Sequence, residues 1–241
     1  MRGGRLLAPL LFALGLAMPA AADTLGVLRE NTLVIFLGDN GSDAPLGEAH
    51  EVACAAPLRG KKGAHYEGGM RVPFIASWAK SSTNEIQKRL PIAAAATQTQ
   101  IASVCDLFPT ILELTATKSP QDHAIDGHSL KKLFTAQADG DRPQTFLMHY
   151  PHAPHRSDYW SSLRSGEWKV IYHYFPSPAS ENLHYQLYHL AADPFEQKNL
   201  AASQPAELQR MMKELVAELT QAKAQYPIDP KTKQAVAPVV P

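Results

Sequence analysis

An acidic and an amide side chain stand next to each other near the start of the chain, at Asp39 and Asn40. Carboxylate and amide oxygens are hard donors that suit Ca²⁺ or Mg²⁺ better than a soft metal. Asp-Asn-Gly is also a common turn, so the triplet by itself favours a structural turn. The segment that follows it is what favours a functional site.

That segment runs from Leu58 to Arg71 and combines basic residues with glycines. Glycine lets the backbone approach a ligand closely, and lysine or arginine supplies charge for an anion. A bare basic loop is usually only solvated. Here an Asp-Asn pair precedes the loop and Tyr-Glu-Gly-Gly-Met-Arg leads out of it, so the pattern predicts a site for a cation and an oxyanion.

Short apolar segments must position these residues. The β-branched and aromatic run Thr32–Leu37 ends in Gly-Asp-Asn-Gly, which predicts a buried strand with Asp39 at the sheet edge where ligands bind. Residues 41–71 lack periodicity and predict a long functional loop, after which Val72–Trp78 resumes as a strand. Apolar residues at helical spacing predict a helix over Gln100–Thr115.

The sequence changes character after residue 140. Thr145–Tyr150, Trp168–Tyr174 and Gln186–Leu190 predict a small antiparallel sheet, and an amphipathic pattern that begins at Pro205 predicts a helix covering it. The fold class is therefore α/β, with a mixed sheet flanked by helices and a smaller antiparallel subdomain that carries a C-terminal helix.

The net charge of the chain gives no general attraction to nucleic acid, because 23 basic residues balance 23 acidic ones.

Residues 1–22 contain two arginines, an apolar run from Leu6 to Met18 and the triplet Ala20–Ala22, which predicts a secretory signal peptide. A membrane anchor is the alternative, but the run is shorter than the roughly 20 residues that span a bilayer. We expect an exported protein, periplasmic or extracellular, without a membrane span.

Cysteines and histidines leave alternatives open. Cys54 and Cys105 are too few for a disulfide framework and predict either one bridge or two thiols. His149, His152 and His155 crowd together and could line the mouth of a pocket. The alternative is histidines packed at a domain interface, because His-x-x-His on a strand fits no particular metal geometry.

The chain resembles the second half of the sulfatase family, within the alkaline phosphatase-like superfamily. The resemblance spans almost all of residues 24–226. Beyond the Thr32–Arg71 block, the motifs that carry it follow in order as Cys105–Thr110, Ile125–Leu130, Leu163–Lys169 and Leu187–Glu196.

The resemblance implies roles for the first block. Asp39 and Asn40 match ligands of the family's divalent cation, Ca²⁺ or Mg²⁺, beside the sulfate group of the substrate. Lys62 matches the lysine that binds this sulfate. Lys61 stands where the family often has glycine, so it is a second candidate for substrate binding.

The histidines and the end of the loop have weaker matches. His65 and His152 are candidates for contact with the substrate. Glu67 and Arg71 match residues that brace the loop through hydrogen bonds.

Sulfatases attack the ester sulfur with a formylglycine made from a Cys/Ser-x-Pro-Ser-Arg motif. The 241 residues contain no such motif, because the sequence after Cys54 places its proline one position late and lacks the serine. The resemblance thus implies that the nucleophile is absent from this chain, as are the paired aspartates of the family's first strand. The sequence then joins a signal peptide to the second half of such an enzyme.

For intact relatives, the resemblance implies hydrolysis of sulfate esters of aryl or carbohydrate substrates. One alternative is a catalytically inactive sulfatase remnant or anion-binding module, and another is a phosphate or phosphonate monoester hydrolase of the same superfamily. The implied organisation is a signal peptide (1–22), a partial catalytic domain (23–140), a C-terminal α+β subdomain (141–226) and a proline-rich tail (227–241).

Overall fold

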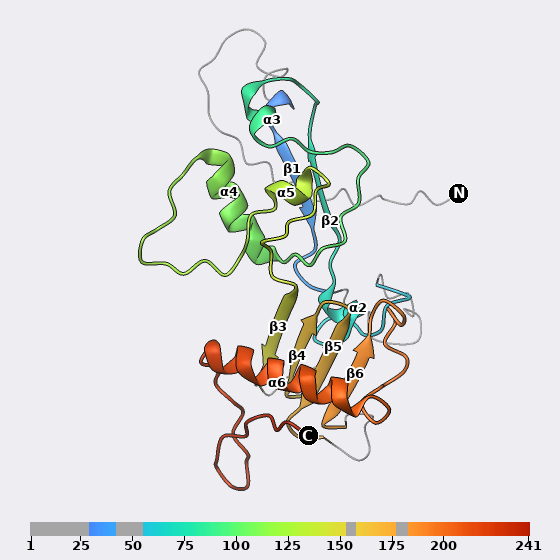
Figure 1. Ribbon diagram of the computed structural model, residues 1–241. Coiled ribbons are helices and arrows are strands. Elements are labelled where there is room, and N and C mark those ends of the chain that lie inside the picture. Colours follow the sequence, from blue (N-terminus) through green and yellow to red (C-terminus); the bar gives the residue numbers. More distant parts are fainter. Residues whose placement is uncertain (1–28, 42–54, 153–157, 177–182) are drawn as a thin grey trace, which may run out of the picture. The chain divides into compact units, whose positions relative to one another are not determined.

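The computed structural model describes most of the chain after the predicted signal peptide. The described residues are 29–41, 55–152, 158–176 and 183–241 (Figure 1). The predicted signal peptide, Cys54 and His155 lie outside them. No helix in this part of the chain is long and apolar enough to span a membrane.

The chain forms two compact units. The first contains the described residues up to Gly38 together with Pro73–Arg142. The second contains Asp39–Val72 and Pro143–Pro241, so the loop that carries the basic residues belongs to the same unit as the C-terminal sheet. The four-part domain organisation drawn from the sequence stays a prediction.

The first unit is built on a two-stranded sheet. β1 (Leu33–Leu37) and β2 (Phe74–Trp78) pair antiparallel, with Leu33 opposite Trp78. Because side chains alternate along a strand, one face of this sheet points into an apolar core and the other points outward. Short helices α3 (Glu85–Arg89) and α5 (Lys131–Phe134) accompany that core. Its buried members are Leu90, Leu130, Leu133 and Phe134.

The predicted helix over Gln100–Thr115 begins later than expected. A 3₁₀ turn, η2 (Val104–Asp106), precedes α4 (Leu107–Thr115), so Pro109 falls in the first turn of α4, where its missing N–H is not needed. Asp106 is buried and accepts a hydrogen bond from Nη1 of Arg142 at 2.8 Å. Because Arg142 is buried as well, this ion pair fastens the start of α4 to the end of the unit.

The second unit is a four-stranded antiparallel sheet in the order β3-β4-β5-β6. These strands are Thr145–Tyr150, Trp160–Ser165, Trp168–His173 and Tyr185–His189. Three were expected from the sequence, but β4 was not. Its Ser161 and Ser162 are buried, so the strand lacks the apolar alternation by which strands are recognised. The mixed α/β architecture of the two units confirms the predicted fold class.

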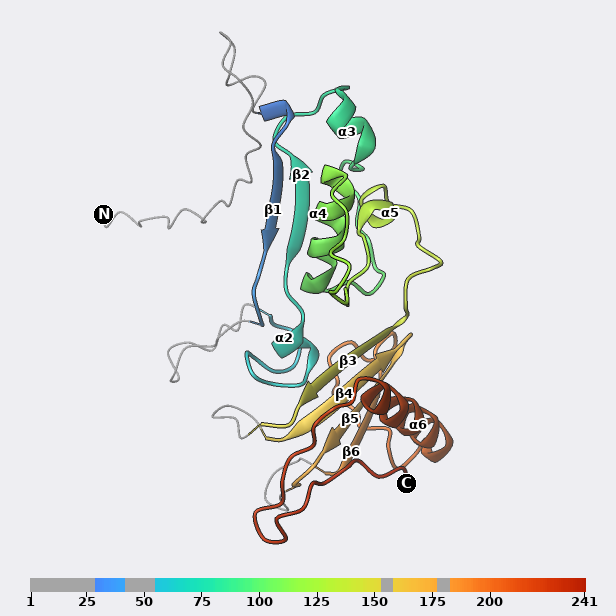
Figure 2. The ribbon, with the colours of Figure 1, turned by 90° about the vertical axis from the view of Figure 1, so that its left-hand side faces the viewer.

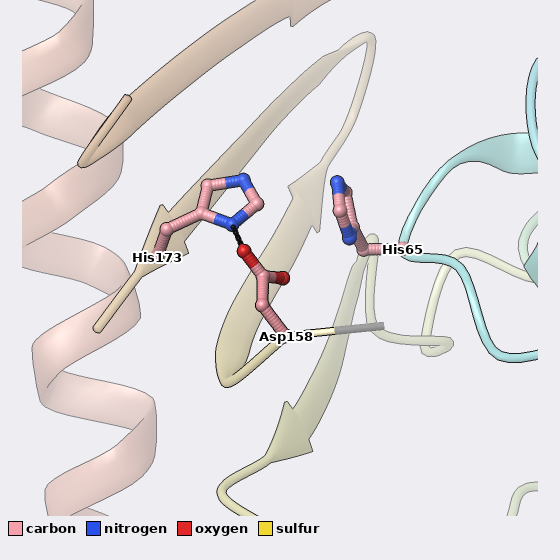
Figure 3. Close-up of side chains that lie close together, drawn as sticks. All are labelled: His65, Asp158 and His173. Carbon is pink, nitrogen blue, oxygen red and sulfur yellow. Dashed lines mark hydrogen bonds and ion pairs between the residues drawn. The ribbon is translucent and has the colours of Figure 1, made fainter. Parts of the chain in front are cut away.

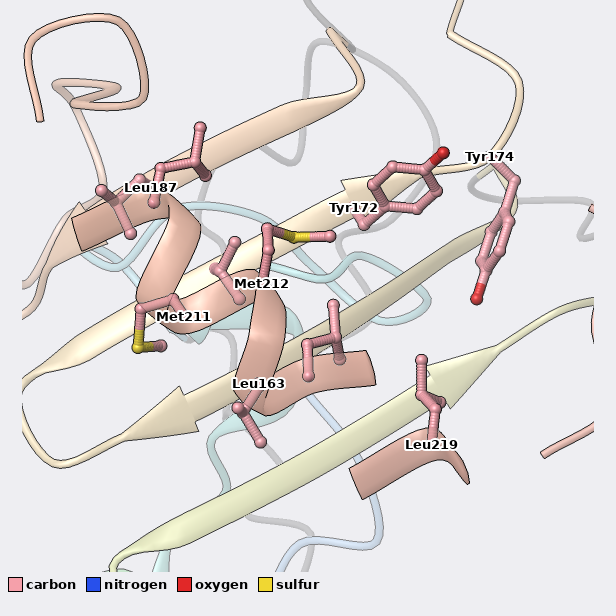
Figure 4. Packing of buried hydrophobic residues seen from close by; sticks show 10 residues of the cluster. Leu163, Tyr172, Tyr174, Leu187, Met211, Met212 and Leu219 are labelled. Atoms are coloured by element: carbon pink, nitrogen blue, oxygen red, sulfur yellow. The ribbon is translucent and has the colours of Figure 1, made fainter. Parts of the chain in front are cut away.

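Helix α6 (Pro205–Gln221) covers one face of this sheet (Figures 1 and 2). Its apolar stripe packs onto side chains from the strands, as Figure 4 shows. The buried residues of the stripe are those that the helical spacing predicts, namely Leu208, Met211, Met212, Leu215 and Leu219. The tail continues this packing, because Val236 and Val240 contact the same core and Val239 O accepts from Tyr185 Oη at 3.0 Å.

The opposite face of the sheet is covered by the loop that precedes α2 (Glu67–Met70). Tyr66 from this loop packs with Trp160, Ile171 and Tyr188 of the strands in a second cluster. Strand alternation sends Lys169, Ile171 and His173 of β5 to this face and Val170 and Tyr172 to the α6 face. The sheet therefore lies between α6 and the basic loop.

Candidate functional site

The Asp39–Asn40 pair follows β1 after one residue, Gly38, and forms an exposed turn. Nδ2 of Asn40 donates to Oδ1 of Asp39 at 3.0 Å and to the carbonyl of Gly41 at 3.3 Å. Both side chains are exposed, so a cation from solvent has access to the carboxylate. The side-chain atoms that could bind a metal are oxygens, which fits a hard divalent cation. Two side chains supply only part of the six to eight ligands that Ca²⁺ takes.

Gly41 fastens this turn to the basic loop. Its N–H donates to the carbonyl of Gly69 at 3.2 Å. On the other side of Gly69, an added Cβ would meet the carbonyl oxygen of Lys61 at 2.5 Å and would also collide with that of Ala64. Gly69 thus lies between the Asp39–Gly41 turn and the backbone of the lysines, and no larger residue fits there.

The loop itself is shaped by two glycines in the left-handed region, Gly60 at φ 86° and Gly63 at φ 88°. The N–H of Ala64 donates to the carbonyl of Lys61 at 2.8 Å, which closes the turn that carries both lysines. Lys61 is exposed, whereas Lys62 is half-buried. The backbone therefore presents the two ammonium groups differently, although they are neighbours in the sequence.

A buried charge network anchors this loop to the sheet. Nζ of Lys169 on β5 lies 2.9 Å from Oε1 of Glu67 and 2.8 Å from Oε1 of Glu196, and all three side chains are almost completely buried. Oε2 of Glu196 also accepts from the backbone N–H of Glu67 at 2.6 Å, and its carbonyl accepts from Nη1 of Arg59 at 2.8 Å. These contacts hold Glu196 in a left-handed conformation at φ 55°, which costs roughly 1–2 kcal/mol.

The two carboxylates of this network differ in their pKa. Burial raises the pKa of Glu196, and Lys169 only partly offsets the effect. Burial alone also raises the pKa of Glu67, but Lys169, Arg164 and Arg71 outweigh it and the net pKa is lowered. Of the two carboxyl groups, Glu67 is thus the one whose ionised form its surroundings favour more.

Glu67 thus holds the basic loop through Lys169 and Glu196, two residues that the sequence analysis did not single out individually. Lys169 and Glu196 lie in two of the motifs that carry the family resemblance, which was the available signal. Arg71 is exposed, and its Nε stands 4.0 Å from Oε2 of Glu67.

The remaining predicted residues have different surroundings. His65 is buried, with its ring 4.6 Å from that of His173 and close to Tyr66 and Trp160. His152 is exposed, and its ring contacts Tyr150 edge to face at 5.6 Å. Roles for these two histidines in substrate contact stay predictions.

Two other predicted side chains are also accounted for. His149 is tied by both ring nitrogens, to Oγ of Ser161 and to the carbonyl of Gln225, each at 2.7 Å. Cys105 is an exposed free thiol.

Among the described residues, His65 forms a cluster with Asp158 and His173. No spacing in the sequence indicated this cluster, because His65 lies far along the chain from the other two residues.

Comparison with known proteins gives a consistent result. Residues 61–225 match the protein family described as N-sulphoglucosamine sulphohydrolase, C-terminal. Human arylsulfatase A is 34% identical over 163 residues, which cover 68% of this chain and 28% of that enzyme. Mouse steryl-sulfatase is 34% identical over 157 residues, which cover 64% of this chain and 23% of the enzyme. The chain therefore spans about a quarter of the length of these relatives.

Solved structures share the same fold. A sulfatase from a glycosaminoglycan-metabolising locus of Bacteroides thetaiotaomicron is 27% identical, with a TM-score of 0.57, over 82% of this chain and 40% of that one. A second structure, solved with its substrate D-glucosamine-2-N,6-O-disulfate, gives a TM-score of 0.60 at 23% identity over 83% of this chain and 36% of that one. At that identity, the second likeness concerns the fold alone.

Proposed function

Because the chain belongs to the sulfatase family, and matches the C-terminal region of its members, we propose that it carries the cation-binding and sulfate-binding half of a sulfate ester hydrolase site. The observation that carries this proposal is the junction at Gly69. It joins the Asp39–Asn40 turn to the loop of Lys61 and Lys62 within one compact unit.

In this proposal, Asp39 and Asn40 contribute oxygen ligands to a divalent cation, Ca²⁺ or Mg²⁺. Such a cation, when bound, polarises the sulfate oxygens and favours attack on sulfur. Lys62 supplies a positive charge to the sulfate group, and charge-assisted hydrogen bonds of this kind strengthen as negative charge develops. The buried Glu67–Lys169 pair holds the loop in place, so that Lys62 need not be ordered when the ester binds.

The substrate that we propose is a sulfate ester of a carbohydrate or an aryl alcohol. Its support is the identity to human arylsulfatase A and to a sulfatase from a glycosaminoglycan-metabolising locus. We also propose that residues 1–22 direct export to the periplasm or the cell exterior, that 23–140 form part of a catalytic domain, and that 141–226 form the C-terminal subdomain. His65, His152 and Lys61 are secondary candidates for contact with the substrate.

Cleavage in this family would require a formylglycine nucleophile, and the 241 residues contain no motif from which it is made. A second candidate, which rests on the same oxygen and lysine side chains, is an anion-binding module that holds sulfate and a cation without hydrolysis. The two candidates share the same binding residues and differ in turnover.

The test compares adjacent lysines. Titration calorimetry with Ca²⁺ and inorganic sulfate should show both ligands binding to the full chain. Lys62→Ala should weaken the binding of sulfate about tenfold or more, because a hydrogen bond to a charged group contributes about 1.5–3 kcal/mol. Lys61→Ala should have little effect on sulfate binding. Asp39→Asn should weaken the binding of Ca²⁺. Equal effects of the two lysine variants, or no binding of either ligand, would refute the proposed site.

Turnover separates the two candidates. The purified chain is incubated with a chromogenic aryl sulfate, with Ca²⁺ or with a chelator. Calcium-dependent release of sulfate would establish a hydrolase, and Lys62→Ala should then remove most of the activity. Binding without turnover would support the anion-binding module.

A further inference from the structure

Two buried imidazoles face each other beneath the basic loop. His65 is 4% exposed and His173 is fully buried at the end of β5. Their ring centroids are 4.6 Å apart with an interplanar angle of 81°. Asp158, which directly precedes the Tyr159-Trp160 entry to β4, completes the group from a third segment. Figure 3 shows the His65 ring turned toward Asp158 and His173.

The hydrogen-bonding state of these rings is unusual for a packed interior. Within the part of the chain that the structure describes, neither ring nitrogen of His65 has a hydrogen-bond partner, and Nε2 of His173 has none either. Buried polar atoms are nearly always satisfied, so orphaned nitrogens that converge need an explanation. A metal ion would supply one, because it accepts the lone pairs that no donor reaches.

The geometry is close to that of a metal site. One candidate ligand atom from each of His65, Asp158 and His173 lies within 4.8 Å of those of the other two. Zn–N and Zn–O bonds are about 2.0–2.2 Å long, so ligand atoms on one tetrahedral ion are about 3.3–3.6 Å apart. The three ligand atoms must therefore approach one another by at most about 1.5 Å to bind one ion.

The protonation state also suits a metal ligand. Burial lowers the pKa of His65 well below its ordinary value, and the charges of His173, Lys169 and Arg59 lower it further. The ring is therefore neutral at physiological pH and has a lone pair to donate. The nearby charge of Lys169 is compensated by Glu67 and Glu196, so it does not leave the site strongly positive.

From these observations we propose that His65, Asp158 and His173 bind a Zn²⁺ ion. Two imidazoles and one carboxylate form a donor set that suits Zn²⁺, in contrast to the all-oxygen pair at Asp39 and Asn40. His173 Nδ1 donates to Oδ2 of Asp158 at 2.9 Å. If these two atoms bind the ion, the ring proton moves from Nδ1 to Nε2, so that His173 stays a neutral ligand, and the fourth position is left for water.

The ion would hold three separate segments together: the basic loop, the entry to β4 and the end of β5. This inference does not depend on the proposed sulfatase activity, because none of the three residues is needed there as a ligand of the hard cation. Failure of one proposal would therefore leave the other standing.

The main experiment measures Zn²⁺ binding by the full chain in competition with a chromophoric chelator. One ion per chain is expected. His65→Gln and His173→Gln should each weaken binding at least about tenfold, the range seen when groups that support a metal site are removed. His149→Gln is the matched control, because both nitrogens of this histidine on the same sheet are already occupied. It should bind Zn²⁺ as the unaltered chain does.

A second measurement needs no variant and so does not depend on variants folding. Co²⁺ added to the unaltered chain should give intense visible d–d bands of a four- or five-coordinate nitrogen and oxygen site, and Zn²⁺ should remove them. Excess Ca²⁺ should not.

Absence of these bands would overturn the proposal. So would equal Zn²⁺ affinity in the His65→Gln variant, or loss of Zn²⁺ binding in Asp39→Asn, which would place the ion at the other turn.

Discussion

At the scale of single residues, Lys169 is the side chain on which most of the second unit's buried charge depends. Its side chain is 1% exposed, and its ammonium group lies between two carboxylates whose side chains are 6% and 0% exposed. A buried ion pair adds little net stability compared with apolar packing, but removal of one partner leaves uncompensated charge behind. The network therefore secures the position of the basic loop more than it adds to global stability.

Lys169→Met should thus destabilise the protein by about 3–5 kcal/mol, because Glu67 and Glu196 would lose their common counter-ion inside the unit. Thermal unfolding followed by circular dichroism measures the change. Lys213→Met is the matched control, since Lys213 is exposed on α6 and should change stability by less than about 0.5 kcal/mol. Equal melting temperatures for the two variants would mean that Glu67 and Glu196 do not need Lys169 as a counter-ion.

A second prediction at this scale concerns the buried phenols. Burial raises the pKa of Tyr174 and of Tyr188 above the ordinary value of about 10. Because the folded pKa is raised, each phenol contributes stability that is fully present below pH 10 and is lost as pH rises through the folded value. Alkaline titration by phenolate absorbance should show these two ionising late, together with unfolding.

Tyr188→Phe should remove one late phenol and no early one. Titration of all eight tyrosines as a single class near pH 10, with native circular dichroism retained, would contradict this prediction.

At the scale of elements, the site depends on the way in which turns and strands meet. Gly69, in α2, has no side chain, and its backbone contacts both the Asp39–Gly41 turn and the loop of Lys61 and Lys62. The β5 strand performs a comparable task by alternation, because Lys169 and His173 reach the loop while Tyr172 faces α6. Backbone geometry, more than any single polar contact, thus positions the candidate ligands.

Gly69→Ala should force these two backbones apart, since the new Cβ would overlap the carbonyl oxygens of Lys61 and Ala64. We expect a stability loss of about 1–3 kcal/mol, typical of overpacking, and weaker binding of both Ca²⁺ and sulfate. Gly140→Ala is the control, because nothing lies within 4 Å of its added Cβ. Unchanged binding in Gly69→Ala would show that the two segments act independently.

At the scale of the whole molecule, the first unit has an apolar face without cover among the described residues. Phe36 is 47% exposed and Ile75 is 61% exposed, and the two stand opposite each other across β1 and β2. Both strands are edges of a two-stranded sheet, so backbone pairing groups are open as well as apolar side chains. Edges of this kind promote association unless another segment or chain covers them.

The purified chain should therefore self-associate, and Ile75→Lys should reduce this association because a charge on an edge opposes strand pairing. Sedimentation velocity over a range of concentrations measures the effect. Leu183→Lys serves as the control, since Leu183 is equally exposed at 63% but lies in the other unit. A monomeric chain with one cooperative melting transition would contradict this expectation.

The sequence by itself determined the features that depend on local patterns. The buried stripe of α6 follows from helical spacing, and the positions of β1, β2 and β3 follow from short apolar runs between turns. The Asp39–Asn40 pair and Lys62 were identified from adjacent residue types and a family motif. Such features are visible because the residues that define them are neighbours in the chain.

Only the tertiary structure decided which distant residues share an environment. Lys169 meets Glu67 from 102 positions away, and His65 meets Asp158 and His173 because strand alternation turns β5 toward the loop. The central strand β4 escaped prediction because burial between two strands lets serines replace apolar residues there. Such pairings depend on which faces pack together, and no local spacing in the sequence encodes that choice.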